Sequence, residues 1–215
     1  MAPVVQRREF LLSVAALALM PRPALAGAQQ YEPMADAVRN ALAAQIADAR
    51  PPERRFERPD ERMAFVAWLG DMSERLKGRL PETPLRIEFL KTVDYESVRA
   101  GLDRQLVLGL IQVESNFRKY AISVAGARGY MQVMPFWTEV LGDGDPRRLF
   151  DMRTNLRYGT VILRHYLDIE KGGLFMALGR YNGSRGRREY PDAVLAAWKG
   201  RWNYEAAAGD SPRRT

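Results

Sequence analysis

The residue best placed to do acid–base chemistry is a glutamate at the end of an apolar helical run. Glu114 follows the apolar run 106–113, and on a helix it shares a face with Leu110 and Ile111. Desolvation on that face and the negative end of the helix dipole both raise the pKa of a carboxyl. A carboxyl that stays protonated near neutral pH can serve as a general acid. Taken alone, a capping or exposed glutamate at a frayed helix end is the commoner arrangement.

Composition limits the other chemistries that the chain could carry. The 215 residues are 47% hydrophobic and 27% charged, which is typical of a globular protein with one domain and an extension. With no cysteine, thiolate metal sites, disulfides and cysteine nucleophiles are excluded. His165 is the only histidine, so any Ser-His-Asp triad would have to include it and a histidine-rich metal site is excluded. We therefore predict no metal and no cofactor.

The first 26 residues have the pattern of an export signal. Arg7 and Arg8 precede an apolar run over residues 10–20, and a small-residue cleavage pattern ends at Ala26. That run is too short for a membrane span, which needs roughly 20 residues. Twin-arginine and ordinary secretory signals both remain open. We expect cleavage after Ala26, an exported periplasmic protein, and no membrane span in the mature chain.

The chain is basic, with a formal charge of +7. A basic surface suits an anionic polymer, but most of the arginines are scattered, and export disfavours nucleic acid as the partner. Arg185, Arg187 and Arg188 form the tight cluster, which is either a solvated loop or a site for carboxylates.

Helical periodicity predicts an all-α fold. Asp60 and Asp103 are the expected N-caps of two of the helices, and the glycine-rich stretch 121–135 is compatible with a small β-hairpin. The domain division that we predict is a helical N-terminal segment over 27–99, a catalytic domain over 100–205 and a flexible tail over 206–215, with a linker near 50–59. The expected helices are 34–49, 60–80, 85–99, 103–114, 135–141, 155–169, 174–181 and 191–202.

Four short motifs then occur in order along the second half of the chain. They are Glu114-Ser115, the run 125–135 (AGARGYMQVMP), the run 155–159 (NLRYG), and Ala177-Leu178 before Tyr181-Asn182-Gly183. Each is weak alone, but the order and spacing together are specific. Over residues 100–202 the chain resembles the family 1 lytic transglycosylases, whose domain is similar to soluble lytic transglycosylase and goose-type lysozyme.

The resemblance implies a lysozyme-like fold and a role for each matching residue. Glu114 would be the sole catalytic acid and base, and Ser115 would support the local geometry. Ser123 would face an acetamido group of the substrate. Tyr181 would hydrogen-bond the catalytic carboxyl. The remaining residues that would bind the substrate are Tyr130, Met131, Gln132 and Asn182.

Two departures from the family pattern concern the neighbourhood of these residues. Tyr130 replaces the usual leucine, where it either fills the same apolar slot, which we favour, or adds a stacking surface. Gly183-Ser184 replaces Ala-Gly after the Tyr-Asn pair, which affects loop shape and subsite preference.

The implied reaction is cleavage of the MurNAc–GlcNAc β-1,4 bond of peptidoglycan, with 1,6-anhydro-MurNAc as product. Ordinary glycosidases need two carboxylates, whereas this reaction needs one. The nearby acids that follow Glu114 are Glu139, Asp143, Asp145 and Asp151, none of them in a motif of its own. A lysozyme-type hydrolase that uses a positioned water and one of the loop aspartates remains an alternative, as does a non-catalytic cell-wall-binding or scaffold module. The expected partner is the glycan strand, and a partner in the cell-wall machinery is left open.

The other aromatic and titratable residues have simpler explanations. Core packing is the preferred interpretation of His165, Trp68, Trp198 and Trp202. Phe136 and Trp137, directly after the Gln132 motif, are equally compatible with core and sugar stacking.

Overall fold

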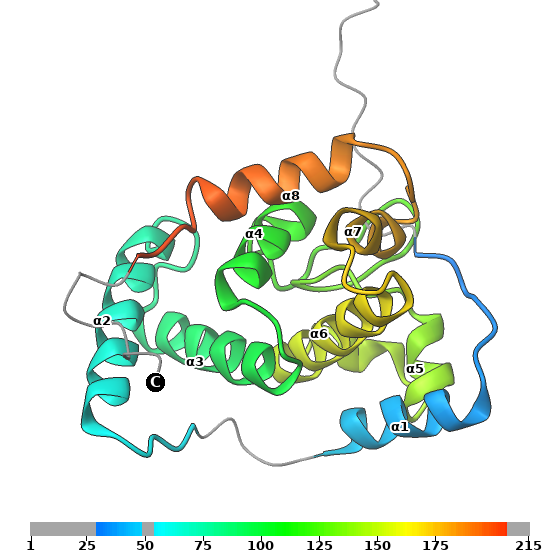
Figure 1. Cartoon of the computed structure of the whole chain (residues 1–215), viewed down its shortest axis with the longest axis horizontal. Helices are drawn as coiled ribbons and strands as arrows, with labels where there is room; N and C mark the ends of the chain where they lie inside the picture. Colours follow the sequence, from blue (N-terminus) through cyan, green and yellow to red (C-terminus); the bar gives the residue numbers. More distant parts are fainter. Residues whose placement is uncertain (1–28, 49–53, 206–215) are drawn as a thin grey trace, which may run out of the picture.

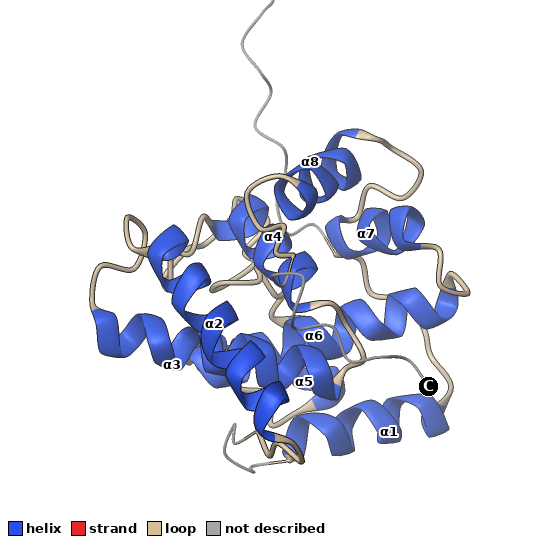
Figure 2. Ribbon diagram, turned by 60° about the vertical axis from the view of Figure 1, so that its left-hand side comes forward, coloured by secondary structure: helices blue, strands red, loops and turns tan. Residues whose placement is uncertain are grey.

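The computed structural model describes residues 29–48 and 54–205. The expected signal peptide, the expected tail and part of the expected linker lie outside these residues. Within the described ranges the fold is all-α, as predicted, and contains no β-strand (Figure 2). None of the helices there has the length and apolarity needed to cross a bilayer.

Eight α-helices and one 3₁₀ helix make up the described fold (Figure 1). Their bounds are α1 Asp36–Ala47, α2 Pro59–Leu76, α3 Thr83–Arg99, α4 Arg104–Ser115, α5 Phe136–Leu141, η1 Pro146–Phe150, α6 Met152–Ile169, α7 Leu174–Asn182 and α8 Glu189–Lys199. The hairpin considered for residues 121–135 is reduced to isolated bridges of Arg128 with Ile122 and Val133.

The two expected N-caps have different outcomes. Asp103 caps α4, since its carboxylate accepts a hydrogen bond from the Leu106 amide at 2.8 Å. The prediction for Asp60 is wrong, because α2 begins one residue earlier, at Pro59. Proline suits the first helical position, where its missing N–H is not needed. Asp60 therefore lies in the first turn, where it pairs with Arg58.

Helix α4 lies at the centre of the core. Its residues Leu106, Val107, Leu108, Leu110 and Ile111 are all buried. A helix that is apolar all round must be covered on all sides. Helices α3 and α8 pack on it. This burial extends to the last two residues of α4, Glu114 and Ser115.

The N-terminal helices pack on the second half of the chain. Helix α1 lies against α5 and α6, and α3 contacts α4 and α6. At the junction, the fully buried Asp94 accepts hydrogen bonds from Arg54 at 2.7 Å and from Arg104 at 2.6 Å. This carboxylate therefore joins the segment before α2 to the start of α4.

Candidate active site

Glu114 occupies the last turn of α4, and its side chain is buried. The residue is 5% exposed. The helix ends immediately afterwards, where Asn116 takes a left-handed conformation. Burial raises the pKa of Glu114 to about 8, against a hydrogen bond from Tyr190 that lowers it. The carboxyl is therefore protonated at neutral pH, as a general acid requires.

Tyr190, in the first turn of α8, is the direct partner of this carboxyl. Its hydroxyl donates a 2.6 Å hydrogen bond to Glu114 Oε1. The other oxygen, Glu114 Oε2, is buried and has no hydrogen-bond partner among the described residues. Burial raises the pKa of Tyr190 well above its usual value, so the tyrosine stays a donor. One carboxyl oxygen is thus held while the other is available for the acidic proton.

Sequence reasoning missed Tyr190 because the closing helix was expected to begin at Pro191. A signal was nevertheless present. Tyr190, Val194 and Ala197 recur at helical spacing, and all three are buried. That apolar face packs on α4, so a polar atom on it lies near the end of that helix.

The expected hydrogen bond from Tyr181 to the catalytic carboxyl is not present. The Tyr181 hydroxyl instead donates to the Met131 carbonyl at 2.8 Å. Burial raises the pKa of Tyr181, and the nearby Glu114 carboxyl acts in the same direction. Tyr181 thus lies beside the acid, but its hydroxyl holds the loop over residues 126–135, which precedes α5. The hydrogen bond that orients the Glu114 carboxyl comes from Tyr190.

Two further side chains shape the same loop from inside. The Ser115 hydroxyl donates to the Tyr130 carbonyl at 2.7 Å, which ties the end of α4 to the loop. Gln132 has a left-handed φ of 47°, and its amide donates to the Ala121 and Gly129 carbonyls. The Gln132 side chain therefore stabilises the turn in this structure.

Asn155 at the start of α6 anchors the loop from outside. Its amide donates to the Arg128 and Leu149 carbonyls, each at 2.9 Å, and its carbonyl accepts from the Met131 amide at 2.8 Å. The contact needs a glycine at position 129, because a Cβ there would lie 2.4 Å from Asn155 Nδ2 and φ is +76°.

Tyr130 and Met131 are packed into the core. Tyr130 is 1% exposed, with its ring 4.8 Å from the ring of Phe89. The burial of Tyr130 supports the interpretation that it fills an apolar slot in the core, and not that it offers a surface for stacking on a sugar. Met131 is fully buried and lies against Gly159 of α6, where any Cβ would collide with its sulfur.

Ser123 and Asn182 flank the loop. The Ser123 hydroxyl is half-buried and accepts a hydrogen bond from the Ala127 amide at 3.1 Å. The Asn182 amide donates to Ser184 at 3.1 Å, while its Oδ1 is buried without a partner among the described residues. Two buried oxygens, Glu114 Oε2 and Asn182 Oδ1, thus have unused acceptor capacity.

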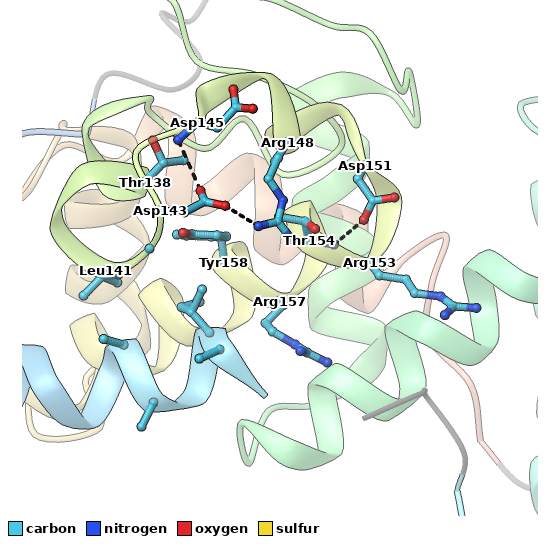
Figure 3. A pocket seen from close by; sticks show the side chains of 15 residues that line it. Thr138, Leu141, Asp143, Asp145, Arg148, Asp151, Arg153, Thr154, Arg157 and Tyr158 are labelled. Carbon is cyan, nitrogen blue, oxygen red and sulfur yellow. Dashed lines mark hydrogen bonds and ion pairs between the residues drawn. The ribbon is translucent and has the colours of Figure 1, made fainter. Parts of the chain in front are cut away.

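Three of the four other acids considered as a second carboxylate line a separate cavity of about 710 Å³ (Figure 3). Helix α1 forms one wall of it, and Tyr158 lies between that wall and the acidic loop. Asp143 pairs with Arg148, Asp145 pairs with Arg147, and Asp151 caps α6. None of the residues around Glu114 lines this cavity. The fourth acid, Glu139, is exposed on α5.

The remaining candidates are mostly structural. Trp68 and Trp202 are fully buried, and Trp198 is partly buried against the core. His165 is half-buried on α6, where burial lowers its pKa. Trp137 is 2% exposed, which places it in the core.

Within the arginine cluster, Arg185 pairs with Glu170 at 2.7 Å and Arg188 with Asp192 at 3.3 Å. Carboxylates of this chain therefore occupy two of the three arginines that were considered for substrate carboxylates.

Comparison with known proteins agrees with this geometry. The model of the transglycosylase SLT domain matches residues 91–193, from within α3 to within α8. The chain is similar to three proteins named membrane-bound lytic murein transglycosylase C. The one from Mannheimia succiniciproducens is 50% identical over 48 residues, covering 22% of this chain and 13% of the relative. The one from Haemophilus influenzae strain PittEE is 36% identical over 93 residues, covering 38% and 26%. The one from Edwardsiella ictaluri is 33% identical over 114 residues, covering 46% and 32%.

The matched part of the chain thus spans at most about a third of the length of these relatives. The matched segment contains Glu114, the loop that Asn155 anchors, and Tyr190. The resemblance predicted from the sequence is therefore confirmed over residues 91–193, which match the transglycosylase SLT domain.

Proposed function

We propose that this chain is a peptidoglycan lytic transglycosylase that cleaves the β-1,4 bond between MurNAc and GlcNAc and leaves 1,6-anhydro-MurNAc ends. The observation that carries the proposal is a buried carboxyl with a pKa of about 8, oriented by a tyrosine and with one oxygen free. The acids considered as a second carboxylate are paired, engaged as a cap, or exposed elsewhere. A single acid–base group is the requirement that distinguishes this reaction from ordinary glycoside hydrolysis.

In the first step Glu114 acts as the acid. The proton on Oε2 passes to the glycosidic oxygen, whose bond to the MurNAc C1 breaks, and GlcNAc leaves. The carboxyl becomes a carboxylate, which the hydrogen bond from Tyr190 to Oε1 stabilises. The N-acetyl group of the substrate would stabilise the positive charge at C1.

In the second step the same carboxylate acts as the base. It takes the proton from the C6 hydroxyl of MurNAc while that oxygen bonds to C1, which closes the 1,6-anhydro ring. Glu114 is then protonated again, and the cycle needs neither a water nor a second carboxylate. Because burial raises its pKa, Glu114 is a stronger base in this step than an exposed glutamate would be.

The substrate contacts remain part of the proposal. We assign Ser123 to an acetamido group, with Met131, Gln132, Tyr181 and Asn182 around the sugars and Tyr130 packed behind them against Phe89. Residues 27–99 would form a helical segment packed on the catalytic domain over 100–205. The signal over residues 1–26 would direct the protein to the periplasm, where peptidoglycan is found.

The test is digestion of purified sacculi followed by mass spectrometry of the released muropeptides. We expect products that end in anhydro-MurNAc and are lighter by one water than those of a lysozyme. Reducing MurNAc ends would instead identify a hydrolase. Binding to sacculi without any release would identify a non-catalytic module.

Substitution of Glu114 tests whether its carboxyl is the catalytic acid. Glu114→Gln keeps the size of the side chain and an acceptor for Tyr190 but removes the proton, so activity should fall by about 10²-fold or more. A folded Glu114→Gln protein with more than about a hundredth of the parent rate would contradict the assignment.

A further inference from the structure

The segment ahead of α1 lies across three elements that carry the candidate site. We call residues 29–33 the strap. It has no helix or strand, and Figure 1 shows it running from beside α7 past the end of α5 to the start of α1. Its side chains contact the 126–135 loop, α5 and α7. No motif in the sequence marked this segment.

The innermost contact of the strap is the side-chain amide of Gln29. Its Oε1 accepts hydrogen bonds from Trp137 Nε1 at 3.1 Å and from the Met134 amide at 3.3 Å. Its Nε2 donates to the Gln132 carbonyl at 3.4 Å. Gln29 is 3% exposed, although the next three residues are exposed. The pocket is therefore built to receive one amide, with donors for its oxygen and an acceptor for its N–H.

Two outer contacts hold the rest of the strap. Glu32 accepts from Arg180 of α7 at 2.5 and 2.6 Å, and the Tyr31 ring lies 6.0 Å from the Phe136 ring. Glu32 and Tyr31 are both more than one third exposed. Contacts of this kind contribute little to stability, so the strap is attached more weakly than the loop that it covers.

Three of the candidate substrate residues are covered in this structure, and Gln29 of the strap lies against two of them, Gln132 and Tyr181. Met131, Gln132 and Tyr181 are each at most 2% exposed. Gln29 also lies close enough to the Tyr181 hydroxyl to affect its pKa. A glycan strand cannot contact these residues in this arrangement. Asn155 holds the loop by three hydrogen bonds of 2.8 to 2.9 Å, whereas the three of Gln29 are longer, at 3.1 to 3.4 Å. The strap is therefore the covering segment that can leave at the lower cost.

We propose that the strap is an intramolecular competitor of the substrate, and that Gln29 fills an amide pocket which an acetamido group of the glycan enters when the strap leaves. An acetamido group has the same C=O acceptor and N–H donor as the glutamine amide. This inference rests on the proposed function, because it takes the ligand to be an N-acetylated glycan. A tethered group competes at an effective concentration roughly in the millimolar range. The strap therefore excludes single sugars, while a strand with several contacts displaces it.

The experiment measures binding of chitotetraose, an N-acetylglucosamine tetramer, by isothermal titration or NMR. The full chain carries Gln29→Ala, Glu32→Lys, or Gln30→Ala as the matched control, since Gln30 is an exposed glutamine on the same strap. Glu32→Lys places a cation against Arg180 and should release the strap without altering the pocket. We expect Gln29→Ala and Glu32→Lys to bind about five- to tenfold more tightly than the parent, and Gln30→Ala to be unchanged.

The deacetylated glucosamine tetramer provides the control for the ligand. It lacks the acetamido group, so we expect no gain with it. Unchanged or weaker chitotetraose binding by both release variants, each with a parent-like melting temperature, would overturn the inference. An equal gain for both tetramers would overturn the amide pocket.

The side-chain amide of Gln29 provides a second readout that does not need a variant. Its Nε2 donates to the Gln132 carbonyl in the closed arrangement, so its ¹⁵N–¹H resonances should move when the parent chain is saturated with chitotetraose, while those of the exposed Gln30 side chain should not. Stationary Gln29 side-chain resonances would count against displacement. The binding results do not depend on turnover, so a failure of the strap proposal is distinguishable from a failure of the anhydro-product test.

Discussion

Two opposing effects set the pKa of Glu114. Burial at the end of α4 raises the pKa to about 8, and the hydrogen bond from Tyr190 lowers it. Burial is the larger effect. The acid form is therefore populated below about pH 8 and lost above it, so the alkaline limb of activity should follow Glu114.

Tyr190→Phe should separate orientation from burial. Loss of the donated hydrogen bond removes stabilisation of the carboxylate, so the pKa of Glu114 rises and the alkaline limb of kcat moves to higher pH. The rate at the optimum should fall about 10- to 100-fold, because the carboxyl is less well oriented. A pH–rate profile on sacculi measures both changes.

Tyr181→Phe is the control, since its hydroxyl donates to the Met131 carbonyl. It should cost about 1 kcal/mol of stability and leave the alkaline limb in place. A shift of the limb with Tyr181→Phe and none with Tyr190→Phe would reverse the assignment.

Glu114 should also make stability depend on pH. The pKa of Glu114 is about 8 in the folded chain, against 4.5 for an ordinary glutamate in the unfolded chain, so between these pH values the folded state binds a proton that the unfolded state has lost. The free energy of unfolding should therefore fall as pH rises from about 4.5 to about 8. Glu114→Gln removes this loss, and its gain over the parent should grow from near zero at pH 4 to an order of 4 kcal/mol above pH 8. Urea unfolding across this range tests the sign, and a gain that does not vary with pH would contradict it.

Among the single residues of the site, the sequence could predict those whose role depends on neighbouring positions in the chain. Glu114 is identifiable because its burial and the helix end follow from neighbouring residues. The Tyr190 contact spans 76 positions and depends on how α8 packs on α4. The sequence correctly indicated that a tyrosine orients the Glu114 carboxyl, but the residue is Tyr190 and not Tyr181. Both tyrosines lie near this carboxyl, on the neighbouring helices α7 and α8.

Among the elements, the loop over residues 126–135 depends most on one side chain. Its only β-pairing is a set of isolated bridges, and three of its residues, Gly126, Gly129 and Gln132, have positive φ. Asn155 supplies three hydrogen bonds that a strand partner would otherwise supply. The first turn of α6 thereby determines where the Met131 carbonyl lies, and Tyr181 bonds to that carbonyl.

Asn155→Ala should lower the free energy of unfolding by roughly 2–4 kcal/mol, because the Met131 amide and the Leu149 carbonyl lose the Asn155 side chain as partner and the Arg128 carbonyl keeps only the bond from the Val133 amide. Activity should fall as well, since the loop no longer holds its position. Chemical denaturation and muropeptide release measure the two effects. The exposed Asn203 is the matched control, and Asn203→Ala should change neither. Equal stability of the two variants would show that the loop is held by other contacts.

Helix positions were predictable to within a few residues, because periodicity and caps are local. Asp103 caps its helix as expected, whereas Asp60 does not, since Pro59 also fits the start of a helix and takes the first position. The 121–135 stretch could not be predicted from its composition. Its shape comes from Asn155, which is 24 residues from Met131.

For the whole molecule, buried ion pairs connect the N-terminal segment to the rest of the chain. Asp94 binds Arg54 and Arg104, and Glu96 binds Arg157 of α6 at 2.9 Å. Removing one partner of a buried ion pair lowers the stability of a protein, because the remaining charge is left without compensation. Residues far apart in sequence therefore fold as one body around α3.

Asp94→Asn should cost roughly 2–3 kcal/mol of stability, because the partly exposed Arg54 and Arg104 lose their common buried carboxylate. The exposed pair of Asp60 with Arg58 provides the comparison, and Asp60→Asn should cost less than about 1 kcal/mol. Thermal and urea unfolding test the difference. A similar small effect of both variants would show that the N-terminal segment is attached by apolar contacts alone.

Ion pairs and hydrogen bonds between residues far apart in the chain could not be predicted from the sequence. The segment 27–99 contains helices that periodicity identifies, but its attachment depends on pairs such as Arg157 with Glu96, 61 positions apart. Gln29 lies 108 positions from Trp137. Polar residues that pair over such distances have no local pattern.

The tryptophans of this fold give the molecule its own spectroscopic labels. The Trp137 indole N–H donates to Gln29 at 3.1 Å, the Trp202 indole donates to Gln112 at 2.9 Å, and the Trp68 indole N–H is buried without a partner among the described residues. Because these three environments differ, the three indole resonances should be resolved from one another in a ¹⁵N–¹H spectrum, in which Trp198 gives the fourth. Added chitotetraose should move the Trp137 resonance and leave those of Trp68 and Trp202 in place. A stationary Trp137 resonance at saturation would show that Gln29 stays bound, so one spectrum of the unmodified chain reports whether the site is closed or open.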